Sequence, residues 1–347
     1  MSLAFREFVR KVGSGTHTHK DLSREDACQA ARMMLMDEAT PAQIGAFLIA
    51  HRIKRPTASE LCGFLDAYGL LCPGIPDQHV DRPVRVFGYP YDGRDRTSPV
   101  APLVALILAA SGIPVVQHGA GVCPTKYGVP LVDLWQTLGV DWRGQSLTTL
   151  GTSLTQIGVA FVYVPTHFPA AQRLMAYRDE IGKRPPLATV ELLWTPYGGA
   201  VHLVAGFVHP PTETLMLEVA HQLGIGDITT IKGLEGSCDL PRSRTAIVHH
   251  RGERCLLKAK DYDLEGTELA WSGPEDWGSQ AHAIIRGETH VPLWPEVLWN
   301  GGVQLFLNGV TPSIASGLTQ TEALITQGQV AQVLTKVQTQ VHPVVVP

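Results

Sequence analysis

The sequence predicts an α/β protein, with an all-helical N-terminal domain and a larger α/β domain on a mostly parallel central sheet. Residues 1–75 show helical patterns only, and from Pro83 onward short β-branched runs alternate with helical segments. The length of 347 residues allows one large domain and a smaller one. We therefore expect a helical domain over 1–75, a helical segment near 168–195 that joins it, and an α/β domain over 80–347.

Composition indicates a globular protein in a reducing compartment. Apolar residues make up 44% of the chain, charged residues make up 17%, and the net charge is −4, which gives no global attraction to nucleic acid or anionic membranes. The six cysteines are scattered without a C-x-x-C motif, so we expect free thiols and a cytoplasmic location. The apolar run Val100–Val116 is short for a membrane span and contains two prolines, which favours a core helix followed by a buried strand.

The N-terminal helices are marked by their first residues. Ser23 is a candidate N-cap, Thr40 precedes a proline at the first helical position, and Thr57 opens a further helix. In the α/β part we expect strands over 84–87, 113–116, 159–164, 202–208, 227–231 and 245–249, and helices over 99–110, 129–138, 169–180, 211–223, 277–287, 292–307 and 317–337. The apolar tail 341–347 is expected to form an edge strand or to lack regular structure.

Two glycine-bearing loops follow the first two predicted strands. They cover Gly88–Arg96 and Gln117–Gly121, and one long apolar helix separates them. Glycine loops after strands expose backbone N–H groups that bind anions, above all phosphate. Parallel strands would place both loops at the same sheet edge, where α/β proteins bind ligands. The alternative is that both are ordinary turns between strands and helices.

Several longer stretches resemble the anthranilate phosphoribosyltransferase family, of glycosyltransferase family 3. The signature is carried by Met33–Lys54, 178–184, 232–236 and 299–302, which read M-M-L-M-D-E-A-T-P-A-Q-I-G-A-F-L-I-A-H-R-I-K, R-D-E-I-G-K-R, K-G-L-E-G and W-N-G-G. The resemblance implies a helical domain hinged to an α/β domain and a homodimer formed through the N-terminal helices. It also implies transfer of phosphoribose from phosphoribosyl pyrophosphate (PRPP) to anthranilate, with magnesium, in tryptophan biosynthesis.

The family motifs are altered at the expected active site. The G-T-G-G-D-G loop that holds the PRPP diphosphate in the family is Gly88–Gly93 here and reads G-Y-P-Y-D-G. The two middle glycines are replaced by Pro90 and Tyr91 and the threonine by Tyr89; proline cannot donate an N–H, and the tyrosines crowd the place where phosphate should approach the backbone. The family's magnesium-binding D-E pair falls on Cys238-Asp239, so one carboxylate is a thiol. These changes are typical of a divergent, anthranilate phosphoribosyltransferase-like branch, whose loop reads Y-x-G-x-R/K-x and is residues 91–96 here.

The candidate site follows from this comparison, and no catalytic residue is assigned. The resemblance gives Arg178 as the acceptor-facing residue, and Glu235 and Asp239 as the residues that could hold a Mg²⁺ ion. The expected PRPP- or phosphate-binding residues are Gly88, Asp92, Gly93, Arg94, Arg96, His118, Gly119 and Lys126. The divergent branch also implies an alternative function, a non-catalytic nucleic-acid-binding protein in which arginines contact phosphates and Tyr89, Tyr91 and Tyr127 stack on bases.

Overall fold

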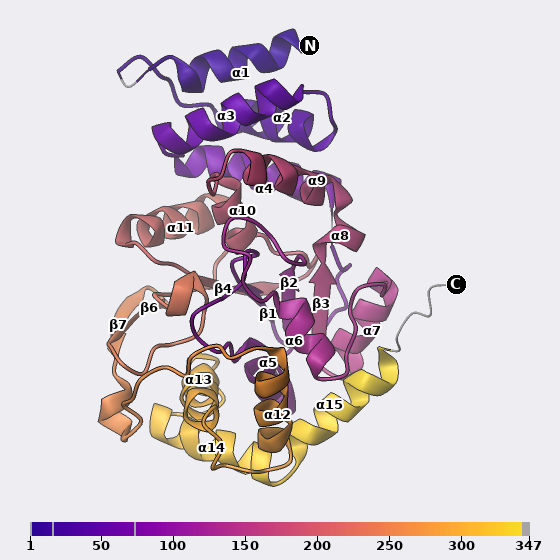
Figure 1. The fold of residues 1–347 in the computed structure, drawn as a ribbon, viewed down its shortest axis with the longest axis vertical. Helices are drawn as coiled ribbons and strands as arrows, with labels where there is room; N and C mark the ends of the chain where they lie inside the picture. The colour runs from indigo at the N-terminus through magenta and orange to yellow at the C-terminus, as the bar shows by residue number, and fades with distance from the viewer. Residues whose placement is uncertain (1, 16, 73, 342–347) are drawn as a thin grey trace.

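The computed structural model describes residues 2–15, 17–72 and 74–341, so the expected tail lies almost entirely outside the described residues. Figure 1 shows the N-terminal helices at one end of the molecule, the sheet in the middle and the C-terminal helices at the other end. The predicted fold class, a helical N-terminal part followed by a larger α/β part, is confirmed.

The N-terminal layer is a bundle whose helices begin where the sequence predicts. Its helices are α1 (Leu3–Gly13), α2 (Arg24–Leu35), α3 (Pro41–Lys54) and α4 (Ala58–Leu71). Thr40 and Thr57 both form capping boxes, which satisfy backbone N–H groups that a helix start leaves free. The rings of Phe5, Phe47 and Phe64 pack together inside the bundle, so apolar burial holds the helices to one another.

A seven-stranded sheet forms the middle layer, in the order β3-β2-β1-β4-β5-β6-β7. The first five strands in this order are parallel and the last two pairings are antiparallel, which confirms a mostly parallel sheet. Its strands are β1 (Val84–Gly88), β2 (Val115–Gly119), β3 (Val159–Tyr163), β4 (Val201–Gly206), β5 (Ile228–Ile231), β6 (Ala246–His250) and β7 (Glu253–Leu257).

Helices cover the sheet and connect its strands. Those between strands are α5 (Ala101–Ala110), α6 (Leu131–Thr137), α7 (Leu147–Gln156), α8 (Val164–His167), α9 (Pro169–Glu180), α10 (Leu187–Leu193) and α11 (Pro210–Leu223). Two 3₁₀ turns follow, η1 (Leu234–Gly236) and η2 (Ala259–Tyr262). The chain closes with α12 (Pro274–Ile285), α13 (Trp294–Leu307), α14 (Ile314–Thr326) and α15 (Gln329–Gln340).

The second strand is the element whose position matters most for the site. The sequence placed it at 113–116, but β2 begins at Val115 and runs through Gln117 and His118 to Gly119. Hydrogen bonding to β3 continues along these residues, with His118 paired to Val162, so they belong to the strand and not to a loop. A phosphate-binding loop at 117–119 is therefore wrong, because both faces of a central strand are covered.

Smaller differences have local causes. The predicted helix 317–337 is two helices, because Gly328 adopts a left-handed conformation (φ 77°) between α14 and α15. Helix α7 was not predicted, since its threonines, serine and glycine are poor helix formers. Strand β7 was not predicted, and its residues lie at the sheet edge without a continuous buried face. Among the described residues no helix is both long and apolar enough to span a membrane, and all six cysteines are free thiols.

Candidate functional site

A cleft of about 1140 Å³ lies where the carboxyl ends of β1, β4 and β5 face the end of α3 and the α9–α10 segment. Parallel strands present these ends at one sheet edge, as expected of an α/β ligand site. The loop that follows β1, residues 88–97 (the β1 loop), reaches the cleft with Pro90, Asp92 and Arg96. No residue of Gln117–Gly121 lines it. The structure therefore brings only one of the two predicted loops to the cleft.

Basic side chains outnumber acidic ones in this cleft by two to one. The acidic lining residues are Asp92, Glu191, Glu218 and Glu235. The basic ones are Arg52, Arg55, Arg96, Lys126, Arg178, Arg184, Lys232 and Arg244. Because the whole chain carries a net charge of −4, the positive charge is concentrated here and focuses attraction for anions.

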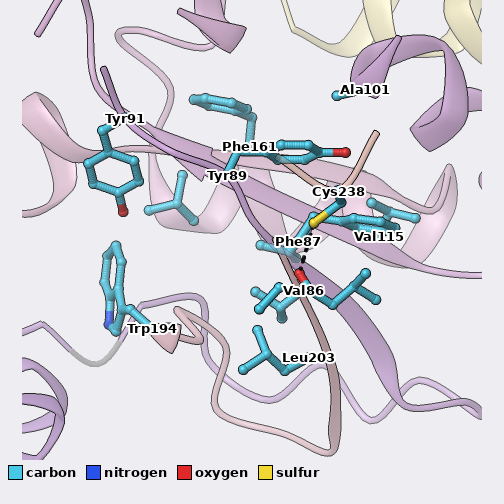
Figure 2. Close-up of a cluster of buried hydrophobic side chains, with 14 of the residues drawn as sticks. Val86, Phe87, Tyr89, Tyr91, Ala101, Val115, Phe161, Trp194, Leu203 and Cys238 are labelled. Atoms are coloured by element: carbon cyan, nitrogen blue, oxygen red, sulfur yellow. Dashed lines mark hydrogen bonds between the residues drawn. The ribbon is translucent and has the colours of Figure 1, made fainter. Parts of the chain in front are cut away.

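The glycines of the β1 loop are needed for close backbone packing. A Cβ at Gly88 would lie 1.9 Å from the carbonyl oxygen of Leu192, and one at Gly93 would lie 2.5 Å from the carbonyl oxygen of Val129. The two glycines thus let the loop pack directly against the backbone at Leu192 and at Val129. Tyr89 and Tyr91 are buried in the apolar cluster of Figure 2, together with the thiol of Cys238.

His118 and Gly119 lie behind this loop, away from the cleft. The Tyr91 hydroxyl and His118 Nδ1 are 2.7 Å apart, and the histidine ring also packs edge-on against Trp194. Burial lowers the pKa of His118 to about 3, so the ring is neutral at neutral pH. This corrects the expectation that His118 and Gly119 contact a phosphate, because the histidine is uncharged and fully covered.

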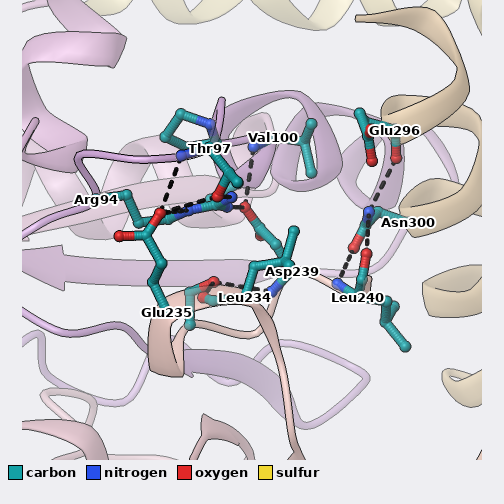
Figure 3. A network of polar contacts seen from close by, with 12 residues as sticks. Arg94, Thr97, Val100, Leu234, Glu235, Asp239, Leu240, Glu296 and Asn300 are labelled. Atoms are coloured by element: carbon teal, nitrogen blue, oxygen red, sulfur yellow. Dashed lines mark hydrogen bonds and ion pairs between the residues drawn. The ribbon is translucent and has the colours of Figure 1, made fainter. Parts of the chain in front are cut away.

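Arg94 is buried, and it is ion-paired with the two predicted magnesium ligands. Its guanidinium contacts Asp239 directly and approaches Glu235 with Nε 3.7 Å from Oε1 (Figure 3). Asp239 also accepts a hydrogen bond of 3.0 Å from the backbone N–H of Val100. The neighbouring Cys238 Sγ lies 3.6 Å from the carbonyl oxygen of Gly88 and 3.4 Å from that of Val204, so the thiol can donate to either.

These residues do not fit a magnesium ion. Mg²⁺ needs clustered oxygen ligands that are free to coordinate, whereas Asp239 is paired with a fixed cation and Cys238 offers a protonated sulfur. Within the described ranges, no three His, Cys, Asp or Glu side chains form a group that could hold a metal. The charge of Arg94 takes the position where the sequence predicted a metal.

Glu235 is held by backbone donors that follow β1 and by Lys126, which lies between β2 and α6. Lys126 Nζ lies 2.5 Å from Oε2, while the backbone N–H groups of Asp95, Arg96 and Thr97 donate to the carboxylate at 3.3, 3.2 and 3.0 Å. Burial alone would raise the pKa of Glu235, but these hydrogen bonds outweigh it and hold the pKa below its usual range. Lys126 and Arg96 therefore lie in the cleft as predicted, with a carboxylate of the chain between them.

Arg178 is likewise matched by an internal acid. Its Nη1 donates to both carboxylate oxygens of Glu191 at 3.1 Å, and Nη2 lies 3.6 Å from Asp92. Arg184 also contacts Asp92, with Nη2 and Oδ2 2.5 Å apart. Arg178 is only 2% exposed, so it offers no free charge to a carboxylate-bearing acceptor.

Sequence reasoning did not assign several cleft cations to the site. Lys232 directly follows β5, so its place at the carboxyl end of a strand was a usable signal. Arg52 and Arg55 lie at the end of α3, and only the tertiary fold brings this helix end over the sheet. The side chains of Arg55 and Lys232 make no hydrogen bond or ion pair with another described residue, so their charges are available to a ligand.

Comparisons with known proteins agree with this architecture. Residues 6–68 match the model of the glycosyl transferase family helical bundle domain. The chain is 29% identical to an uncharacterised protein of Aquifex aeolicus over 315 residues, covering 87% of this chain and 93% of that one. It is 25% identical over 324 residues to the anthranilate phosphoribosyltransferase of Laribacter hongkongensis, covering 90% and 92% of the two chains.

Solved structures share the fold along nearly the whole chain. The anthranilate phosphoribosyltransferase of Thermus thermophilus superimposes with a TM-score of 0.81 at 22% identity, covering 97% of this chain and 99% of the other. The Saccharomyces cerevisiae enzyme in complex with PRPP and Mg gives a TM-score of 0.85 at 18% identity, covering 98% of each chain. With its helical bundle and its mostly parallel sheet, the chain shares the fold of the anthranilate phosphoribosyltransferases and is similar to them in sequence along most of its length.

Proposed function

We propose that this cytoplasmic protein binds a phosphate-bearing ribosyl ligand of the PRPP class in the basic cleft, as the donor in a pentosyl transfer to a nitrogen acceptor. The observation that carries the proposal is the two-to-one surplus of basic side chains in the cleft. The yeast relative in complex with PRPP and Mg supports the ligand class. Arg96, Lys126 and Lys232 are the cations that would face the phosphates.

Fixed cations replace magnesium in this proposal. Pentosyl transfer passes through an oxocarbenium-like state while a diphosphate departs with several negative charges, so catalysis consists mainly of positioning and charge neutralisation. Arg94 fills the space between Asp239 and Glu235, and the free charges of Lys232 and Arg55 lie in the cleft. Binding of the donor is therefore expected without a divalent ion.

The acceptor is expected to lack a carboxylate. Arg178 already holds the Glu191 carboxylate, so an acidic acceptor such as anthranilate would have to displace a buried ion pair. Breaking such a pair costs about 3–5 kcal/mol when one partner is left unpaired. A neutral aromatic amine or a nucleobase fits the cleft better, and anthranilate itself should give no turnover.

Titration calorimetry with PRPP tests the proposal directly. We expect saturable binding with the same affinity in EDTA and in magnesium, and weakening by about tenfold in Lys232→Met. Lys336→Met is the matched control, because Lys336 is exposed on α15 and does not line the cleft. Absence of binding at millimolar PRPP, or binding only with magnesium, would overturn the proposal.

A second candidate function is single-stranded nucleic-acid binding. It is favoured by four cleft arginines that are exposed to solvent and come from both sides of the cleft, namely Arg52, Arg55, Arg96 and Arg244. Contacts from four arginines would release about four counterions, which predicts a slope of about −3 in log affinity against log salt. Fluorescence anisotropy with labelled single-stranded DNA over a salt series measures this slope, and a salt-independent or undetectable signal would exclude this function.

We also propose a homodimer formed through the N-terminal helices. Four large apolar side chains of this part of the chain are exposed, namely Leu3, Met36, Ile53 and Leu70. Exposed apolar groups of this kind are often covered by a partner surface. Light scattering on the full chain should give twice the mass of 37.6 kDa, and Ile53→Glu should shift it toward the monomer.

A further inference from the structure

Three consecutive backbone amides of the β1 loop point at one carboxylate. Asp95, Arg96 and Thr97 donate their N–H groups to Glu235, and the hydroxyl of Thr97 donates to the same oxygen as its own amide, at 2.9 Å. Lys126 completes the set, with Nζ 2.5 Å from Oε2 of Glu235 and also 3.1 Å from the carbonyl oxygen of Gly93. We call these donors, from residues 95–97 and Lys126, the amide cradle.

The amide cradle has the chemistry of a phosphate site. Consecutive N–H groups form a concave nest that binds anions, and a lysine ammonium adds a full positive charge. Arg94 and Arg96 each bring a guanidinium Nε to 3.7 Å from the Glu235 carboxylate. One carboxylate is therefore surrounded by three cations, of which Arg94 is already paired with Asp239. A dianion with four oxygens would use this donor set more fully than a monoanion with two.

The amide cradle lies beside the cleft, with the Glu235 carboxylate filling it. Arg96, Lys126 and Glu235 all line the cleft of about 1140 Å³, although only 3% of the Glu235 side chain is exposed. The side chain of Arg96 is 73% exposed beside it. Displacement of the Glu235 side chain would open the cradle directly into the cleft.

The backbone that carries Glu235 is held in an unfavourable conformation. Glu235 has φ 54° and ψ 22°, a left-handed conformation that costs a residue with a side chain about 1 kcal/mol or more. It lies between Gly233 and Gly236, and Gly236 also has a positive φ of 83°. The contacts of the carboxylate with the cradle offset this cost, and the flanking glycines leave the segment free to adopt other conformations once those contacts are lost.

We propose that the amide cradle is a binding site for a phosphate group and that Glu235 is its internal occupant, which a phosphate-bearing ligand displaces. The inference rests on the proposed function, because the cradle lies beside the same cleft. It adds the place where one phosphate group binds and the carboxylate, Glu235, that competes with it. Removal of the Glu235 carboxylate then strengthens phosphate binding, whereas a purely structural carboxylate would weaken it by unfolding the loop.

Titration with inorganic phosphate tests the inference. In Glu235→Gly, which also suits the left-handed backbone, we expect the affinity for phosphate to rise at least about tenfold over wild type. Glu235→Gln keeps the size of the side chain and should give a smaller rise. Glu218→Gln is the matched control, since it removes one acidic charge from the cleft without touching the cradle, and it should change affinity by less than about twofold.

The outcomes separate this inference from the proposed function. Adding Lys126→Met to Glu235→Gly should abolish the gain, because the cradle loses its ammonium group. Unchanged or weaker phosphate binding in both Glu235 variants, with thermal unfolding showing that Glu235→Gln is folded, would overturn the inference. A wild-type protein that fails to bind PRPP would defeat the proposed function alone, because the comparison of variants uses phosphate.

Discussion

The ion pair of Arg94 and Asp239 gives the sharpest test of the site. Both side chains are nearly fully buried, with 5% and 4% of their surface exposed. In Arg94→Ala the Asp239 carboxylate keeps the N–H of Val100 but loses its counter-charge. Removing one partner of a buried pair costs about 3–5 kcal/mol, whereas an exposed pair costs less than about 1 kcal/mol. We therefore expect Arg94→Ala to lower the free energy of unfolding by about 3 kcal/mol or more.

Urea unfolding followed by circular dichroism measures this loss, and a double-mutant cycle assigns it to the pair. Asp239→Asn in the Arg94→Ala background removes the orphaned charge and should recover more than half of the loss. Arg94→Lys keeps the charge but not the forked geometry of the guanidinium, so it should lower the free energy of unfolding by less than Arg94→Ala does. A loss below about 1 kcal/mol, or no recovery on adding Asp239→Asn, would refute the assignment of a buried ion pair.

The same variant tests whether Arg94 stands in for a metal. In Arg94→Ala, the oxygens of Asp239, Glu235 and Thr97 would surround the space that the guanidinium leaves. Magnesium at about ten times its dissociation constant would then stabilise the variant by about 1.4 kcal/mol. Wild type should show no such shift, because its own cation fills the space. Equal responses of wild type and variant would contradict the metal-replacement argument.

Three further predictions concern other parts of the fold. Gly88→Ala should destabilise the protein by about 2 kcal/mol or more in urea, because its Cβ would lie 1.9 Å from a carbonyl oxygen of α10, while Gly69→Ala, with no atom within 4 Å, should not. Burial lowers the pKa of His202 to about 4, although a nearby aspartate opposes this effect, so the unfolded chain takes up a proton at a higher pH than the folded chain does. The free energy of unfolding should therefore fall by up to about 3 kcal/mol from pH 6.5 to 4, and urea titrations of His202→Gln should show a smaller fall. Glu191→Gln should remove the main counter-charge of Arg178, leaving only Asp92 at 3.6 Å, and should create affinity for benzoate that wild type lacks; calorimetry showing no binding would contradict the proposed neutralisation.

Local signals in the sequence were enough for the architecture. Capping residues such as Thr40 and Thr57 mark helix starts that depend on a few neighbouring residues, so they could be predicted within one residue. The alternation of strands and helices was enough for the mostly parallel sheet. The start of β2 could not be placed in this way, because Ile113 and Val115 are equally strand-like and only pairing with β3 decides the register.

The site was harder to predict, because its charges are decided by partners far apart in the chain. Arg94 and Arg96 differ by two positions, yet one is buried against Asp239 and the other is exposed in the cleft. No sequence spacing reveals that Glu191 reaches Arg178 or that Glu235 caps residues 95–97. The predicted residues were mostly brought to one region, but the charge that each presents to a ligand depends on these tertiary contacts.

One pattern connects these contacts. Each charge expected to meet a ligand is matched by an opposite charge of the chain: Asp239 by Arg94, Lys126 by Glu235 and Arg178 by Glu191. Such pairs stabilise the site in the absence of a ligand. A ligand with the same charge as the internal partner must displace that partner, so its binding free energy is reduced by the cost of breaking the pair. The unmatched charges of Arg55 and Lys232 carry no such cost, so a first encounter with an anionic ligand should occur there. Variants at these two residues should therefore slow association, whereas variants at Glu235 should change affinity after docking.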